Sequence, residues 1–220
     1  MSKLYFYGGW KLDFAAFEAI SKDKQQRVIN AALGEFSSKG YKMASTNEII
    51  REAGISKGLL FHYFHSKKQM FLYIYDYALA VVSEEMSDKL DFTDTDILNR
   101  FRQMAILKID IMKKYPQMYE FLLMANSESS EELADDLQTR NIKYVEDFHN
   151  RILNNIDVQK FRKNLDTNKA ISVAFWTMEH FTNRPQDNWE LRVNSTPHYD
   201  NVIQDLDSYF KFLRQVFYGE

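Results

Sequence analysis

Glycine and proline are scarce in this chain, which has only seven Gly and three Pro among its 220 residues. Both residues interrupt helices, so their scarcity leaves long segments that can be helical from end to end. Apolar residues recur at intervals of three and four positions in most of these segments. The sequence therefore predicts an all-α fold.

Several classes of function are excluded by what the sequence lacks. The chain has no Cys, so it can form no disulfide, no thiolate metal site and no cysteine nucleophile. It contains no GxSxG, P-loop or GxGxxG motif, and its five His do not form a metal-ligand pattern. We therefore expect no enzymatic activity, no cofactor and no metal site.

No apolar run approaches the roughly 18 residues that span a bilayer. The N-terminal segment lacks the apolar stretch and the small-residue cleavage site of a signal peptide. We expect a cytoplasmic protein without a membrane partner.

The formal net charge of −3 hides a division along the chain. Residues 1–68 carry eleven Lys and Arg against six Asp and Glu, a net of +5, whereas residues 69–220 carry seventeen against twenty-five, a net of −8. A basic N-terminal part is typical of a module that binds a polyanion, although charge alone is equally compatible with chance clustering.

The first clear helix is expected over residues 23–40. Asp23 can cap its N-terminus, and Gly40 follows its last turn. Its apolar residues lie on one face.

Two short helices follow in quick succession. Ser45 and Glu48 have the spacing of a capping box, and Gly54 ends the helix that they begin. Ser56 can cap the next helix, and Ser66 a longer one that starts at residue 67. The tight turn from Ala53 to Ser56 makes the two short helices cross steeply, as in a helix-turn-helix. In that motif the second helix enters the major groove of DNA and would direct Lys57, Leu59, His62 and Tyr63 at the bases.

The ordered string from Ser45 to Phe64, followed by Lys67, closely resembles the DNA-binding domain of tetracycline-repressor-type regulators. The resemblance covers about residues 24–72 and includes Ala31, Ala32, Phe36, Gly40 and Tyr41. It implies about nine helices: a three-helix DNA-binding domain and a larger helical domain that binds a ligand and forms a dimer. The expected divisions are an N-terminal extension at 1–22, the DNA-binding domain at 23–67 and the second domain at 68–220.

By this resemblance, the start of the second helix approaches a phosphate, which suits its free N–H groups. Lys67 is expected to clamp another phosphate. The expected DNA-binding residues are Ser45, Thr46, Asn47, Lys57, Gly58, Leu59, His62, Tyr63 and Lys67. This sequence departs from the family pattern at Phe61, where Tyr is usual, and at Tyr63, where His is frequent. We therefore expect Tyr63 to contact a phosphate, with a core position as the alternative, and Phe61 to pack inward.

Beyond residue 92 the pattern stays helical, with a long loop expected at 182–200 around Pro185 and Pro197. The expected helices cover roughly 95–114, a short piece after Pro116, 130–156, 166–183 and 200–217. The last two have the apolar stripe of helices that pack on a partner. In the family they form a four-helix dimer interface, which implies a homodimer on a palindromic operator. The alternative for these stripes is burial within one chain.

Methionines and aromatic residues are abundant in the second domain and could line an adaptable apolar cavity. The candidate pocket residues are Met104, Met112, Tyr115, Tyr119, Phe121, Tyr144, Phe148, Phe175, Trp176 and Glu179. The alternative is that these residues are ordinary helix core. Carboxylates interleaved with them, such as Asp110, Asp147 and Glu179, raise the further hypothesis of a cationic ligand held by charge and cation–π attraction.

The resemblance implies a repressor that a small apolar or amphipathic effector releases from double-stranded DNA. A helical protein-interaction or membrane-surface module without specific DNA binding is the alternative. One segment stays undecided between two roles: the aromatic N-terminal residues could cap the DNA-binding domain or reach DNA. They are Tyr5, Phe6, Tyr7, Trp10, Phe14 and Phe17.

Overall fold

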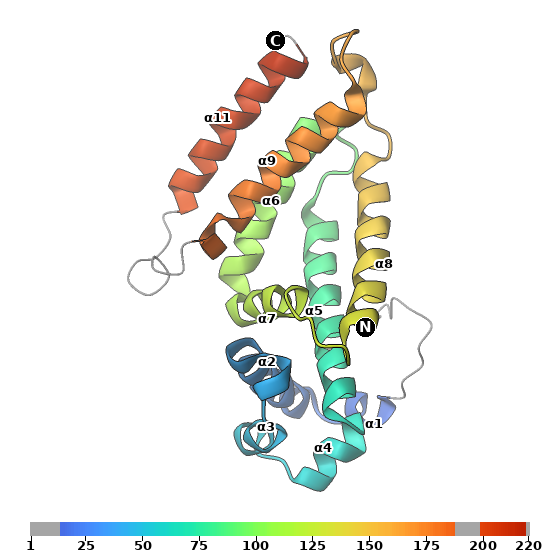
Figure 1. The fold of residues 1–220 in the computed structure, drawn as a ribbon, viewed down its shortest axis with the longest axis vertical. Coiled ribbons are helices and arrows are strands. Elements are labelled where there is room, and N and C mark those ends of the chain that lie inside the picture. The colour runs from blue at the N-terminus through green and yellow to red at the C-terminus, as the bar shows by residue number, and fades with distance from the viewer. Residues whose placement is uncertain (1–13, 188–198, 219–220) are drawn as a thin grey trace. The chain divides into compact units, whose positions relative to one another are not determined.

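The computed structural model describes residues 14–187 and 199–218. Over these ranges the chain forms helices and no strand, which confirms the all-α fold class (Figure 1). The helices are α1 (Ala15–Glu18), α2 (Lys22–Met43), α3 (Thr46–Ala53), α4 (Lys57–Phe64), α5 (Lys67–Lys89), α6 (Ile97–Lys114), α7 (Pro116–Asn126), α8 (Ala134–Leu153), the short 3₁₀ turn η1 (Val158–Lys160), α9 (Thr167–Asp187) and α11 (Tyr199–Phe217).

The helices pack into two compact units. The first contains the described residues up to 84 together with 115–147, and the second contains 85–114 and the described residues from 148 onward. The first unit therefore combines α1 to α4 and most of α5 with α7 and the start of α8. The two units do not coincide with the expected domains at 1–22, 23–67 and 68–220. Those domain limits were assigned by expected function and stay a prediction.

Aromatic rings from three helices form the centre of the first unit. The ring centroid of Phe71 on α5 lies 5.0 Å from that of Phe36 on α2 and 5.2 Å from that of Phe121 on α7. All three side chains are fully buried. Burying one such ring contributes roughly 1.5–3 kcal/mol, so α7 is an integral part of this core.

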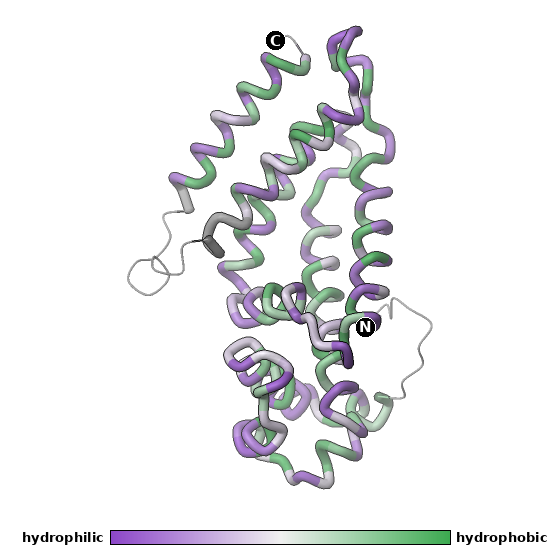
Figure 2. Tube along the Cα trace, in the orientation of Figure 1, coloured by the Kyte–Doolittle hydropathy of each residue, from purple (hydrophilic) through white to green (hydrophobic). Residues whose placement is uncertain are grey.

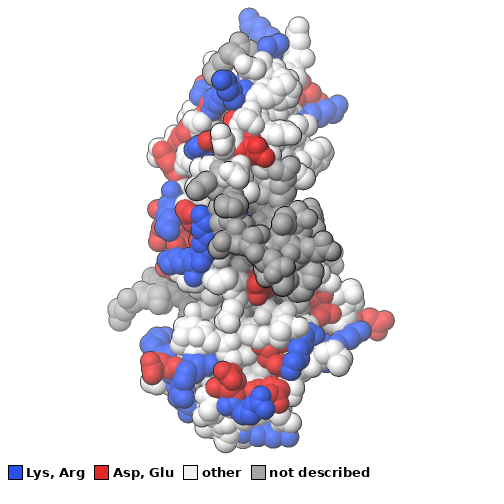
Figure 3. All heavy atoms as spheres, turned by 90° about the vertical axis from the view of Figure 1, so that its left-hand side faces the viewer, with Lys and Arg blue, Asp and Glu red and all other residues white. Residues whose placement is uncertain are grey.

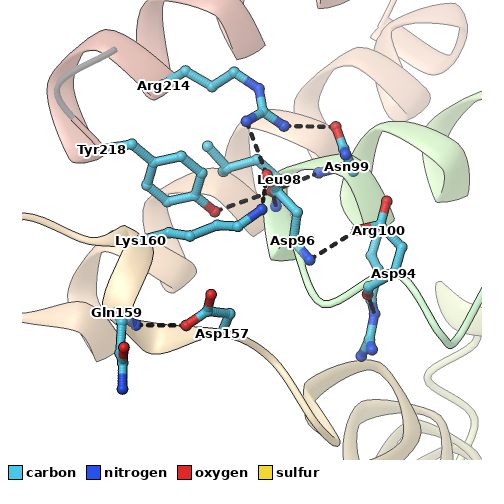
Figure 4. A network of polar contacts seen from close by, with 10 residues as sticks. All are labelled: Asp94, Asp96, Leu98, Asn99, Arg100, Asp157, Gln159, Lys160, Arg214 and Tyr218. Atoms are coloured by element: carbon cyan, nitrogen blue, oxygen red, sulfur yellow. Dashed lines mark hydrogen bonds and ion pairs between the residues drawn. The ribbon is translucent and has the colours of Figure 1, made fainter.

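A buried guanidinium ties the second unit together at the start of α6 (Figure 4). Arg100 is fully buried and donates to four backbone carbonyl oxygens at distances of 2.5–2.8 Å. They belong to Phe92, Asp94, Ile152 and Asn154. The loop before α6 is thereby fixed to the end of α8.

Asp96 joins the same region to α11 (Figure 4). Its carboxylate accepts hydrogen bonds from Arg214 at 2.9 Å, from Lys160 at 3.1 Å and from the hydroxyl of Tyr218 at 3.1 Å. Burial raises the pKa of Asp96, but the hydrogen bonds from Arg214, the Asn99 backbone and Lys160 outweigh burial and hold that pKa below its ordinary value. Asp96 is therefore charged in this polar network and links α6, η1 and α11.

The helix limits differ from the expected ones at two places. α2 begins at Lys22 after Ser21, so Asp23 lies within its first turn and is not its N-cap. α9 continues through Pro185 to Asp187, so the prediction of a loop from residue 182 is wrong in its first part.

Gly40, expected to follow the last turn, interrupts α2 with a φ of 69° and a ψ of 171°, but the C-cap of the helix is Ala44. The chain bends there but forms one more turn, up to Met43. Among the residues described, no helix is long and apolar enough to span a membrane.

Replacing Arg100 by Met should lower the free energy of unfolding by about 3–5 kcal/mol, because four backbone carbonyl oxygens lose a fully buried donor. Arg102→Met is the matched control on the same helix, since Arg102 makes a half-exposed ion pair with Asp207. It should cost less than about 1 kcal/mol. Urea unfolding followed by circular dichroism measures both, and equal losses would contradict the role given to Arg100.

Candidate nucleic-acid interface

The turn between α3 and α4 has the geometry that the sequence predicted. Gly54 adopts a left-handed conformation with a φ of 63°, which a residue with a side chain rarely adopts. The N–H of Ile55 then donates to the carbonyl of Ile50 at 3.2 Å and closes the end of α3. Ser56 caps α4 by accepting from the N–H of Leu59 at 3.3 Å. The expected roles of Gly54 and Ser56 are therefore confirmed.

The predicted capping box at the start of α3 is wrong. The side chain of Ser45 makes no cap hydrogen bond, and Glu48 forms an ion pair with Arg51 one turn along the helix. The backbone N–H of Ser45 instead donates to the carboxylate of Glu35 on α2 at 2.7 Å. The side chain of Ser45 therefore does not cap α3, and the carboxylate of Glu35 lies at the positive end of the helix dipole.

One face of α4 is buried and the opposite face is exposed. Leu60, Tyr63 and Phe64 are buried on the inner face. Lys57, Gly58 and His62 are exposed, and Leu59 is half-buried. The outer positions follow helical spacing, so they form one continuous stripe. At α3, Asn47 is exposed, while Ser45 and Thr46 are half-buried.

Tyr63 is more deeply buried than Phe61, although Phe61 also packs against the core as expected. Tyr63 is only 4% exposed, and its ring centroid lies 5.6 Å from that of Phe17. Phe61 is half-buried at the edge of the same core. Phe17 of α1 packs against the ring of Tyr63 and accounts for its burial.

Two of the undecided N-terminal aromatic residues belong to this core. Phe14 and Phe17 are buried, with ring centroids 4.8 Å from Tyr73 and 4.7 Å from Phe64. This packing corresponds to the role of capping the DNA-binding helices. The other four, Tyr5, Phe6, Tyr7 and Trp10, lie outside the residues that the structure describes.

Both lysines that follow α4 have partners within the chain. The ammonium of Lys67 donates to the carbonyl of Lys42 at 3.1 Å and lies 4.8 Å from the ring centroid of Tyr41. The ammonium of Lys68 is 2.8 Å from the carboxylate of Asp136. A phosphate contact by Lys67 would therefore compete with these interactions.

Charges of both signs lie close together on this part of the surface. Figure 3 shows blue and red side chains interspersed in its lower part. Ion pairs such as Glu35 with Lys39 and Glu48 with Arg51 explain the mixture. Lys57, at the first position of α4, adds an exposed positive charge to a surface that carries both signs.

The candidate pocket residues are divided between the two units. Tyr115, Tyr119, Phe121 and Tyr144 belong to the first unit, and the other six to the second. Phe121 is core between Phe36 and Phe71, while Trp176 is 66% exposed. The burial of Met104, Met112 and Tyr119 fits either core or pocket.

The hypothesis of a cationic ligand loses its main carboxylate. Glu179 is 3.3 Å from the ammonium of Lys108, so its charge is already compensated. Asp110 and Asp147 are exposed to water.

Comparisons with known proteins agree with this geometry. The model of bacterial regulatory proteins of the tetR family matches residues 28–74. The TetC protein of transposon Tn10 from Escherichia coli is 33% identical over 73 residues, which are 33% of this chain and 37% of TetC. The chain thus spans little more than a third of the length of this relative.

Solved structures extend the likeness to the whole fold. A TetR family regulator from Chloroflexus aurantiacus is 18% identical, has a TM-score of 0.61 and aligns over 92% of this chain and 97% of its own. FadR from Bacillus subtilis, solved with stearoyl-CoA, is 15% identical, has a TM-score of 0.59 and aligns over 86% and 96% of the two chains.

The burial of Tyr63 predicts that its hydroxyl contributes little to DNA binding. Tyr63→Phe should keep DNA affinity within about twofold, because the ring and its packing remain. Tyr63→Ala should lower the free energy of unfolding by about 3–5 kcal/mol through loss of a core ring. Fluorescence anisotropy with DNA and urea unfolding measure the two effects. A large loss of DNA affinity in Tyr63→Phe, with an unchanged free energy of unfolding, would instead support a phosphate contact by the Tyr63 hydroxyl.

Proposed function

Because the chain belongs to the tetR family of bacterial regulatory proteins, we propose that it is a repressor that binds a palindromic operator as a homodimer and is released by a small effector. The observation that carries the DNA-binding part is the helix-turn-helix, whose second helix buries one face and exposes the other. Members of this family are transcription regulators and not enzymes, in agreement with the missing catalytic motifs.

The exposed stripe of α4 provides the groups that read bases. Lys57 can donate to the O6 and N7 acceptors of guanine, and His62 can donate to or accept from a base edge. Leu59 can contact a thymine methyl group. The start of α3 supplies N–H groups for a backbone phosphate, which would set the orientation of α4 in the groove.

Exposed apolar residues on α9 and α11 support the homodimer. Along α11, Tyr209, Phe212 and Val216 recur at intervals of three and four positions, and Phe212 is 58% exposed. Val173 and Trp176 are exposed on α9, and both helices show apolar segments between polar ones (Figure 2). An exposed stripe of large apolar residues is unfavourable in water and marks an interface. A two-fold dimer through these helices would place two α4 helices about one turn of DNA apart, roughly 34–36 Å.

An apolar or amphipathic effector is the ligand that the methionines and aromatic residues favour. FadR from Bacillus subtilis, which has the same fold, is solved with stearoyl-CoA. An acyl ligand is therefore the first class to test against this chain. The effector would act by shifting the population of dimers toward a state whose two α4 helices no longer fit the operator.

A DNA fragment selected from a random-sequence pool by the wild-type protein tests the role of Lys57. Lys57→Ala should weaken binding by about tenfold and relax the preference at one base position, because a base contact is worth roughly 1–3 kcal/mol. Lys39→Ala, which removes an exposed lysine of α2 paired with Glu35, is the control for loss of charge. Fluorescence anisotropy measures the affinities. If the two variants behaved alike, or if the pool yielded no palindrome, the alternative of a helical interaction module would be favoured.

Phe212→Glu should convert the dimer to monomers by placing a charge in the apolar interface. The dimer dissociation constant should rise by at least about tenfold, since truncating a central aromatic residue commonly costs 2 kcal/mol or more. Ile142→Glu is the control, because Ile142 is also an exposed apolar residue but lies on α8. Sedimentation velocity over a concentration series measures both. A wild-type protein that stays monomeric at micromolar concentration would exclude the dimer.

A further inference from the structure

The segment from Ser130 to Arg140 packs on the same core as the helix-turn-helix. Leu133 is fully buried and Leu137 nearly so, in the cluster that contains Phe36 and Phe71. We call residues 130–140 the arm. Its polar side chains surround these two apolar anchors and contact both ends of the helix-turn-helix.

Before the start of the helix-turn-helix, the arm contacts the last turn of α2. The hydroxyl of Tyr41 donates to the carboxylate of Glu132 at 2.6 Å. Tyr41 directly follows the bend at Gly40, and its ring packs against that of Phe71 at 5.3 Å between centroids. Only a few residues separate Tyr41 from the start of α3, so Glu132 restrains the chain as it enters the helix-turn-helix.

After the end of the helix-turn-helix, the arm contacts the first turn of α5. The carboxylate of Asp136 is 2.8 Å from the ammonium of Lys68 and 3.2 Å from the guanidinium of Arg140. Arg140 in turn donates to Asp76 of α5 at 2.9 Å. Lys68 stands three residues after His65, where the chain leaves α4 with a positive φ of 58°.

Lys67 connects the two ends to each other. Its ammonium lies against the ring of Tyr41 and donates to the carbonyl of Lys42, both at the end of α2. The residues just before α3 and just after α4 therefore form one junction, and the arm contacts it from both sides.

We propose that Glu132 and Asp136 are positioning residues for DNA binding: the docked arm holds both ends of the helix-turn-helix in the orientation that fits the operator. This inference rests on the proposed DNA-binding function. A DNA-reading helix must be held to within about 0.5 Å, and small displacements of its two ends are enough to misplace it. Neither carboxylate is fully buried, so each contact can break and reform without unfolding the core.

The direction in which DNA affinity changes distinguishes a positioning carboxylate from one that only repels the phosphates. Removing an acidic side chain from a protein that binds DNA ordinarily strengthens binding, because repulsion of the phosphates decreases. Loss of a positioning carboxylate should weaken binding instead.

The test uses Glu132→Ala, Asp136→Asn and Tyr41→Phe, with the DNA fragment selected by the wild-type protein as the probe. Each variant should weaken binding by about threefold to tenfold, and the salt dependence should stay that of the wild type because no phosphate contact is lost. The double variant with Tyr41→Phe and Glu132→Ala should bind DNA about as well as whichever of the two single variants binds it less tightly. Each substitution removes the same hydrogen bond between Tyr41 and Glu132, so their effects should not add. Glu131→Ala is the control, because Glu131 is an exposed neighbour in the same arm. It should bind as well as the wild type or slightly better.

Hydrogen exchange provides the second measurement. Amide exchange over residues 41–68 should accelerate in Glu132→Ala and Asp136→Asn, while the thermal unfolding midpoint stays within a few degrees of the wild type. Unchanged or stronger DNA binding in these variants would overturn the proposal, as would additive effects in the double variant. A wild-type protein that selected no DNA sequence would instead refute the proposed function.

Discussion

The burial of one face of α4 is the constraint on which the DNA-binding surface depends. Tyr63 and Phe64 pack against Phe17 of α1, and the ring of Phe64 also lies 5.4 Å from that of Tyr73 on α5. A helix of eight residues has little stability of its own in water, so this tertiary packing holds it in shape. It also decides which side chains remain outside. Once Leu60, Tyr63 and Phe64 are inside, helical geometry leaves Lys57, Gly58 and His62 on the surface.

Local signals in the sequence predicted the helix-turn-helix well, because they act between near neighbours. Gly54 and Ser56 perform their roles within three residues, and the same holds for Ser66, which caps α5 by accepting from the N–H of Gln69. The errors have the opposite origin. Ser45 is bonded to Glu35 ten residues earlier, and Tyr63 is buried by Phe17, 46 positions before it. Pairings over such distances are set by packing, which one sequence without its fold does not reveal.

The candidate effector residues illustrate the same limit. Methionine and aromatic side chains serve equally well as core or as pocket lining, so their abundance does not separate the two uses. Phe121 turns out to be core of the first unit, whereas Trp176 is an exposed residue of the face attributed to the dimer. Periodicity predicted correctly that α9 and α11 carry apolar stripes. It could not indicate which apolar residues face inward, because that depends on the neighbours of each helix.

The arm leads into α8 and contacts both ends of the helix-turn-helix. α8 begins in the arm within the first unit and ends in the second, where the carbonyl of Ile152 accepts from the buried Arg100. Burial raises the pKa of Asp76 to about 6 against the opposing effect of Arg140, and the ion pair between α5 and α8 is partly shielded, with 10% of the Arg140 side chain and 33% of the Asp76 side chain exposed. Arg140 itself belongs to the arm, so a displacement of the arm away from α5 strains this pair together with the contacts of Glu132 and Asp136. Glu132 is exposed, and the pair of Asp136 with Lys68 is partly exposed, so each of these contacts is individually weak. On our proposal, the orientation of the helix-turn-helix therefore depends on several contacts that a shift of the first turns of α8 would loosen together.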